Sequence, residues 1–202
     1  MKLSGIFTKH FKNPKGILGS VAGKIMAHEN DELYKWTFKQ MDIQPKDRIL
    51  EIGFGPGEGL HMLLEEYKKV KADGIDPSQT MYDQAKKRNK EFISNGQLHL
   101  MKGTAEDLFA DNHTYDKIYA VNNFPLWKDR FATLQRIQSL LKIEGELVIT
   151  LQPRQEEATR DQAFTYADEI QHLLMEAGLS DVKVKFKHIK PSLSICVSAK
   201  NI

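Results

Sequence analysis

Cysteine is nearly absent from this chain, because Cys196 is the only one among 202 residues. A single thiol excludes an internal disulfide framework and a zinc site built from cysteine pairs. Long apolar runs are also missing, since no stretch reaches the roughly 18 residues that a membrane-spanning helix needs. Residues 1–24 are basic but contain no long apolar core of a secretory signal. We therefore expect a cytoplasmic protein with no membrane partner.

A strong excess of either charge is missing too. The chain has 29 Lys and Arg against 27 Asp and Glu, and the resulting net charge of +2 is too small to indicate a nucleic-acid partner by itself. Hydrophobic residues make up 41% and charged residues 28%, which is typical of a soluble globular protein. The length suffices for one domain with a sizeable core. We expect a monomer or a homodimer.

The most informative stretch is residues 49–60, ILEIGFGPGEGL, where an apolar strand ends in an acid and runs through a glycine-rich turn into a helix. Glycine permits positive φ and lets a ligand approach the main chain closely. A strand that enters a helix through such a turn forms a nucleotide-sized cleft. A dinucleotide fold uses GxGxxG, whose third glycine would fall on Glu58, and a carboxylate there would face a pyrophosphate unfavourably. Nicotinamide or flavin binding is therefore disfavoured.

Strands and helices alternate along most of the remaining chain, which favours βαβ units and a parallel sheet. The last two strands are joined by a turn too short for a crossover, so they must be antiparallel. We expect one domain at 31–202, preceded by residues 1–30 as a lid or as a frayed tail with one packing helix. The expected strands are 48–52, 70–75, 97–102, 115–121, 145–151, 182–188 and 193–199. The expected helices are 31–41, 57–70, 79–95, 127–141 and 162–177, with a turn and short helix at 103–109.

Polar residues follow the strands at the sheet edge where ligands bind in open α/β sheets. Asp76 follows the second strand, and a carboxylate there can accept both hydrogen bonds of a ribose diol. Thr104-Ala105-Glu106 follows the third strand, and Asn122 follows the fourth. These positions predict one continuous site with the glycine turn.

Together these motifs resemble those of class I S-adenosylmethionine-dependent methyltransferases over roughly residues 30–200. The resemblance implies a doubly wound, mostly parallel seven-stranded α/β sheet of Rossmann-like form, with the last strand antiparallel. It also implies a glycine loop against the methionine part of the cofactor, Asp76 on the ribose, and no metal. Residues 14–30 are similar to the N-terminal lid of small bacterial members. The cofactor positions carried over are Glu51, Gly53, Phe54, Gly55, Gly57, Asp76, Pro77, Met81, Thr104, Ala105, Glu106 and Asn122.

The resemblance implies an in-line displacement on an already activated methyl group, so holding the nucleophile and methyl carbon collinear and dry lowers much of the barrier. A base, where one is needed, must reach the proton of the acceptor. Candidate catalytic groups are His28, Glu106 and Asn122. Two further candidates, Tyr119 and His61, are expected in the core and in solvent, respectively.

The acceptor is expected near Phe124 and Trp127, with Tyr166 lining the same pocket, although the aromatic pair could instead cover the sheet end. Methyltransferases that act on base or amide nitrogens carry Asn/Asp-Pro-Pro-Tyr/Phe at this place. Residues 123–126, NFPL, lack the first proline and the last aromatic residue. A small organic acceptor is therefore favoured. The alternatives are N-methylation of RNA or protein, and a non-catalytic cofactor-binding module.

Overall fold

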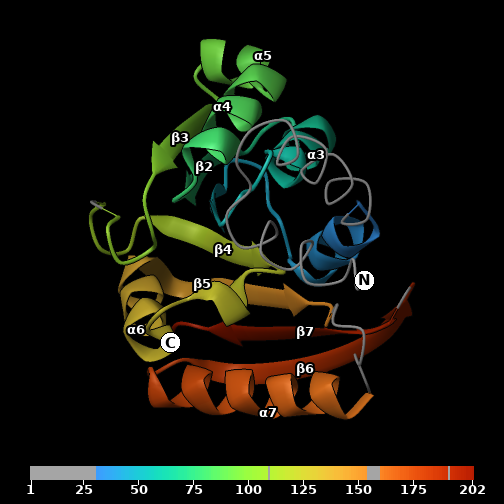
Figure 1. Ribbon diagram of the computed structural model, residues 1–202. Helices are drawn as coiled ribbons and strands as arrows, with labels where there is room; N and C mark the ends of the chain where they lie inside the picture. Colours follow the sequence, from blue (N-terminus) through green and yellow to red (C-terminus); the bar gives the residue numbers. More distant parts are fainter. Residues whose placement is uncertain (1–30, 109, 154–159, 191) are drawn as a thin grey trace.

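The computed structural model describes residues 31–108, 110–153, 160–190 and 192–202 (Figure 1). The expected lid at residues 1–30, which includes His28, lies outside these residues. No helix in the described ranges is both long and apolar enough to cross a membrane.

The described residues form a seven-stranded sheet in the order β3-β2-β1-β4-β5-β7-β6. Strands β1 to β5 pair in parallel, and β7 runs antiparallel to both β5 and β6. The expected doubly wound, mostly parallel sheet with an antiparallel last strand is confirmed. The strands are β1 (Arg48–Ile52), β2 (Lys71–Asp76), β3 (Leu98–Lys102), β4 (Tyr115–Val121), β5 (Leu141–Leu151), β6 (Ser180–Ile189) and β7 (Ser192–Lys200).

Helices cover both faces of the sheet, because its central strands are apolar on both sides. One face packs against a helix at residues 31–40 and against α3, α4 and α5, with Leu33 and Leu60 fully buried there. The other face packs against α6 and α7, with Ile137 and Ile170 fully buried (Figure 1). The helices are α3 (Glu58–Glu66), α4 (Gln79–Arg88), α5 (Lys90–Ser94), α6 (Arg130–Leu140) and α7 (Arg160–Glu176), and a 3₁₀ turn, η1, spans Phe124–Leu126.

Two predicted helices differ from the structure. The single helix expected at 79–95 is two helices that meet at Asn89, whose buried side-chain amide donates to the carbonyls of Gly57 and Ala85. The prediction of a short helix near 103–109 is wrong for the described residues, which form a turn. There the Asp107 carboxylate accepts from both the backbone N–H and the hydroxyl of Thr104, and such local bonds compete with helix formation.

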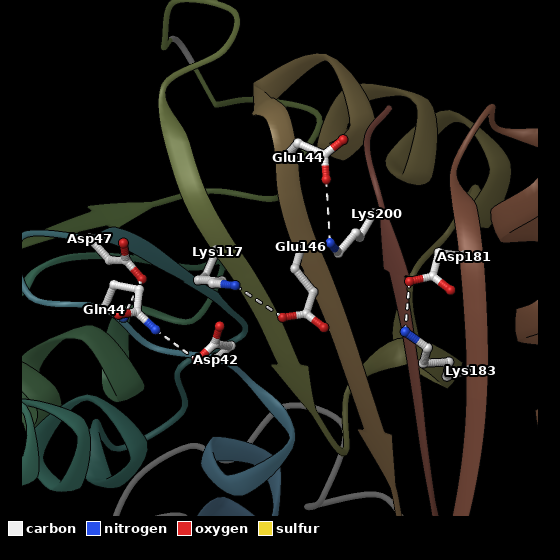
Figure 2. Close-up of polar contacts among 9 residues, drawn as sticks. All are labelled: Asp42, Gln44, Asp47, Lys117, Glu144, Glu146, Asp181, Lys183 and Lys200. Carbon is white, nitrogen blue, oxygen red and sulfur yellow. Dashed lines mark hydrogen bonds and ion pairs between the residues drawn. The ribbon is translucent and has the colours of Figure 1, made fainter.

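The edge of the sheet where the parallel strands begin is fastened by polar contacts (Figure 2). Lys117 on β4 donates to Glu146 on β5 at 3.1 Å, and both side chains are mostly buried. The buried amide of Asn201 donates to the carbonyl of Leu141 at 2.9 Å and accepts from the Gln138 side chain at 2.7 Å. The Asn201 contacts tie the end of β7 to the junction of α6 and β5. The opposite edge of the sheet remains available for a site.

Candidate functional site

The turn that joins β1 to α3 depends on three glycines in the left-handed region. Their φ values are 69° at Gly53, 53° at Gly55 and 79° at Gly57. Other residues pay a steric penalty there because of their Cβ atom. The expected glycine-rich loop is therefore present, and its backbone conformation explains why glycine recurs at alternate positions.

The three glycines have different surroundings. A Cβ on Gly53 would lie 2.5 Å from the amide nitrogen of Asn123, and one on Gly57 would lie 2.7 Å from that of Asn89. A Cβ on Gly55 would have no described atom within 4 Å. The first and third glycines are thus needed for packing within the protein. Among the described residues, Gly55 borders open space, as a residue does where a ligand approaches the main chain.

Asp76, the last residue of β2, is 7% exposed and hydrogen-bonds the backbone of the glycine loop. Its Oδ2 accepts from the Gly55 N–H at 2.9 Å and its Oδ1 from the Ser78 N–H at 2.8 Å. Burial raises the pKa of this carboxyl, and the two N–H groups offset part of the rise. Each carboxylate oxygen can accept a second hydrogen bond, so Asp76 keeps the capacity to bind a diol.

Glu51 lies under the loop and is fully buried. Its Oε2 accepts from the Tyr119 hydroxyl at 2.9 Å, and the Tyr34 hydroxyl and the Leu60 N–H also donate to this carboxylate. Tyr34 also borders it, since a Cβ on Gly59 would lie within 3 Å of both side chains. Burial raises the pKa of Glu51 to about 8, although the hydrogen bonds from Tyr119 and Tyr34 oppose the rise. A buried carboxylate at this place suits a donor such as an ammonium group.

The turn after β3 brings together the expected Thr104-Ala105-Glu106. Ala105 is buried at 2% exposure, and Thr104 is half-buried. The Glu106 side chain accepts from the Thr133 hydroxyl at 2.6 Å. Partial burial raises the pKa of Glu106, but hydrogen bonds from Thr133 and Thr104 outweigh it and lower the pKa overall. A lowered pKa makes Glu106 a weak base.

Three further expected cofactor positions lie near the loop with different exposures. Pro77 is exposed directly after Asp76, and Met81 is buried in the first turns of α4. The ring of Phe54 is fully buried, where it packs so closely on β2 that a Cβ on Gly74 would lie 2.8 Å from it. Only the backbone of Phe54 is therefore available to a ligand at the loop.

The two asparagines after β4 have different partners. Asn122 accepts from the Gln152 N–H at 2.8 Å, at the end of β5. Asn123 reaches the glycine loop, where its amide donates to the carbonyl of Ile52, and it also accepts from the indole N–H of Trp127 at 2.9 Å. The sequence pattern indicated Asn122, whereas the residue that contacts the glycine loop is Asn123, which the pattern did not indicate.

The expected acceptor aromatics share the hydrophobic cluster that α6 and α7 cover. Phe124 is fully buried, and its ring centre lies 5.2 Å from that of Trp127, which is half-buried. Tyr166, on α7, is half-buried against the same cluster. Phe164 instead contacts the exposed ring of Phe186 on β6.

The remaining base candidates are engaged elsewhere. Tyr119 is fully buried, as expected, and burial beside Glu51 raises its pKa well above the ordinary value, so it stays a hydrogen-bond donor. His61 is half-buried and packs edge-on against Phe92 at 5.6 Å, so the expectation of a solvated side chain is wrong. The Tyr119 hydroxyl therefore offers no free base at the loop.

A hollow of about 470 Å³ lies away from the loop, between the first residues of β1 and β4. Arg48, His99 and Arg136 line it, and the buried Asp73 accepts there from Arg48 at 2.8 and 3.0 Å and from the Tyr115 hydroxyl at 2.9 Å. The hollow exists because the described residues between β3 and β4 include no helix that would cover this part of the sheet. We therefore place the candidate site at the loop.

Comparison with known proteins identifies the family. Residues 49–145 match a family model described as a methyltransferase domain. The uncharacterized methyltransferase YdaC of Bacillus subtilis is 37% identical over 180 residues, which cover 89% of this chain and 97% of YdaC. The chain therefore belongs to the class I S-adenosylmethionine-dependent methyltransferases, and it is an enzyme of that class.

Solved structures share this fold at low identity. A methyltransferase from Aquifex aeolicus has a TM-score of 0.69 at 17% identity, covering 84% of this chain and 89% of that one. Phosphoethanolamine N-methyltransferase 2 of Haemonchus contortus, in complex with S-adenosyl-L-methionine, also has a TM-score of 0.69, at 14% identity, covering 84% of this chain and 52% of that one. These matches show the fold alone. The open space that Gly55 borders among the described residues, and the buried carboxylate of Glu51, fit S-adenosylmethionine, the cofactor of this family.

The buried Glu51 predicts an unusual dependence of stability on pH. Its pKa is about 8 in the folded protein and about 4.5 in the unfolded chain, so between these values only the folded state keeps the proton. The contribution of Glu51 to stability is therefore fully present below about pH 4.5 and is lost as the pH rises toward 8, by up to about 1.4 kcal/mol per pH unit. Urea unfolding of wild type and Glu51→Gln at about pH 5, 6.5 and 8 measures this difference.

We expect Glu51→Gln to be increasingly stabilised relative to wild type as the pH rises, because the amide cannot ionise. Glu91→Gln, at an exposed position on α5, is the matched control and should follow the wild-type profile. Parallel pH profiles for wild type and Glu51→Gln would show that Glu51 does not hold a proton in the folded state.

Proposed function

We propose that this methyltransferase binds S-adenosylmethionine across the glycine loop and transfers its methyl group to a small organic acceptor beside Trp127. Asp76 would hold the ribose hydroxyls, and Glu51 would accept from the amino group of the methionine part. The turn at 104–106 would lie at the adenine edge. The single observation that carries this assignment is the open space at Gly55, flanked by two buried carboxylates at the ends of adjacent strands.

A small acceptor is favoured over a base or amide nitrogen by the bonds of Asn123. An amide that grips a target amine must direct its carbonyl oxygen at it, because the amine N–H donates. The Asn123 oxygen is instead directed at Trp127, whose indole N–H donates to it, and the Asn123 nitrogen donates to Ile52. The small net charge of +2 also argues against RNA as the acceptor.

When bound, the cofactor supplies a methyl group activated by its sulfonium. The protein then contributes orientation and the exclusion of water, which together can supply much of the rate enhancement in a bimolecular displacement. Asp76 and Glu51 lie on neighbouring strands and would fix the ribose and the methionine part of the cofactor relative to the loop. Holding both parts would restrict the orientation of the methyl group between them.

We assign no catalytic base to the reaction. Glu106 has a lowered pKa and a hydrogen bond from Thr133, and Tyr119 donates to Glu51. Both groups act as hydrogen-bonding partners within the protein. The acceptor would thus be a group that is nucleophilic once it is desolvated and aligned.

The acceptor class is tested by S-adenosylhomocysteine release in three separate fractions of a bacterial extract: metabolites, total RNA and protein. We expect release with the metabolite fraction, and mass spectrometry should find a small compound carrying one additional methyl group. The same assay with Asp76→Ala controls for unrelated activity in the extract. Methyl transfer confined to RNA or protein would replace the proposed acceptor class, and binding without transfer in any fraction would favour the non-catalytic alternative.

Loss of the Asp76 carboxylate should weaken cofactor binding strongly. A hydrogen bond to a charged group contributes about 1.5–3 kcal/mol, so we expect Asp76→Ala to lower the affinity for S-adenosylhomocysteine by at least about tenfold. Calorimetric titration measures the affinity. Asp83→Ala, on the exposed face of α4, is the control and should bind like wild type. Equal affinities in Asp76→Ala and wild type would remove the ribose assignment.

A methyl group at Gly55 should block the cofactor while the fold persists. Gly55→Ala puts a side chain into the open space at φ 53°, and Gly96→Ala puts one into equally open space at φ 74°, beyond α5. Both variants should lose about 1–2 kcal/mol of stability through left-handed strain. Only Gly55→Ala should lose cofactor affinity, by about tenfold or more in calorimetry. Equal binding by the two variants would mean that the cofactor lies elsewhere.

A further inference from the structure

We propose that Asn123 is a positioning residue that couples Trp127, on the acceptor side, to the glycine loop, on the cofactor side. The inference rests on the proposed function, because it assumes that Trp127 lines the acceptor pocket and that the cofactor binds at the glycine loop. The conformation of the loop then depends on the indole ring of Trp127 through the side-chain amide of Asn123.

One end of this amide is fixed to the glycine loop. The nitrogen of Asn123 donates to the carbonyl of Ile52, the residue directly before the loop, and lies 3.4 Å from the carbonyl of Val121. It also lies against Gly53, where a Cβ would approach it to 2.5 Å. The amide therefore packs on the first residue of the loop and holds the peptide that precedes it.

The other end is fixed to Trp127, whose indole N–H donates to the Asn123 oxygen at 2.9 Å. The orientation of the amide follows from chemistry, since an indole can only donate and a backbone carbonyl can only accept. Exchanging the oxygen and nitrogen of Asn123 would break the bonds at both ends. The amide is thus a two-ended connection with one allowed orientation.

The backbone around Asn123 makes this connection short and stiff. Its carbonyl accepts from the Leu126 N–H at 2.8 Å, and the Phe124 carbonyl accepts from the Trp127 N–H at 3.2 Å. The half-buried Trp127 packs against the fully buried Phe124. A molecule that moves the indole ring would pull on the amide of Asn123 and, through it, on the carbonyl of Ile52.

A double-mutant cycle tests the coupling, with S-adenosylhomocysteine affinity measured by calorimetry. Asn123→Ala removes the connection, and we expect about tenfold weaker binding. Trp127→Phe keeps an aromatic ring but removes the N–H, and we expect about threefold weaker binding. Because Trp127 acts on the loop through Asn123, the double variant should bind like Asn123→Ala alone. Additive losses would overturn the inference.

A spectroscopic readout separates positioning from a general loss of structure. Trp36 and Trp127 are the two tryptophans of the chain, so Trp36→Phe leaves Trp127 as the sole indole reporter. In that background, S-adenosylhomocysteine should change the emission of Trp127, and adding Asn123→Ala should abolish the change at saturating ligand. Adding Asn201→Ala instead removes a buried asparagine at the opposite edge, and the change should persist. An emission change that survives Asn123→Ala would overturn the inference.

The failure of the proposed function gives a different result from the failure of this inference. A wild-type protein that does not bind S-adenosylhomocysteine would overturn the cofactor assignment, and the coupling with it. A wild-type protein that binds normally, with Asn123→Ala equal to it, would overturn the coupling alone.

Discussion

The site depends on the hydrogen bonds that hold a flexible, glycine-rich loop in one conformation. Gly53, Gly55 and Gly57 take left-handed backbone angles, and such a segment lacks the regular backbone hydrogen bonds of a helix or a strand. Buried polar side chains from three other elements replace those bonds. Asp76 accepts from Gly55, Asn89 donates to Gly57, and Asn123 donates to the residue before Gly53. The loop is therefore preorganised by the protein before any ligand arrives.

The same residues set the electrostatics of the site. The two buried carboxylates, Glu51 and Asp76, lie at the ends of adjacent strands, and burial raises the pKa of each. A buried carboxylate is costly to ionise alone and is stabilised by a donor or a cation. Under the proposed assignment, these two carboxylates would bind the diol and the ammonium group of S-adenosylmethionine. The acceptor side, by contrast, is aromatic, with Phe124 buried and Trp127 half-buried.

The sequence predicted the residues whose positions follow from chain order alone. Glu51 and Asp76 each end a parallel strand, and such ends share one edge of the sheet, so their proximity followed from the strand pattern. The supporting side chains did not follow from it. Asn89 lies inside what reads as one continuous helix, and Asn123 differs from its neighbour Asn122 by one residue in a turn, where no periodicity fixes direction. Their roles depend on tertiary contacts with the loop.

The position of β7 constrains the order in which the molecule can be assembled. Strand β6 is made before β7, yet it pairs with no described strand except β7, which lies between it and β5. During synthesis, β6 therefore has no partner in the sheet until residues 192–200 have left the ribosome. Strands β1 to β5, with the glycine loop, can pair earlier. The part of the sheet that carries the glycine loop can thus form first, and β7 then joins β6 to β5.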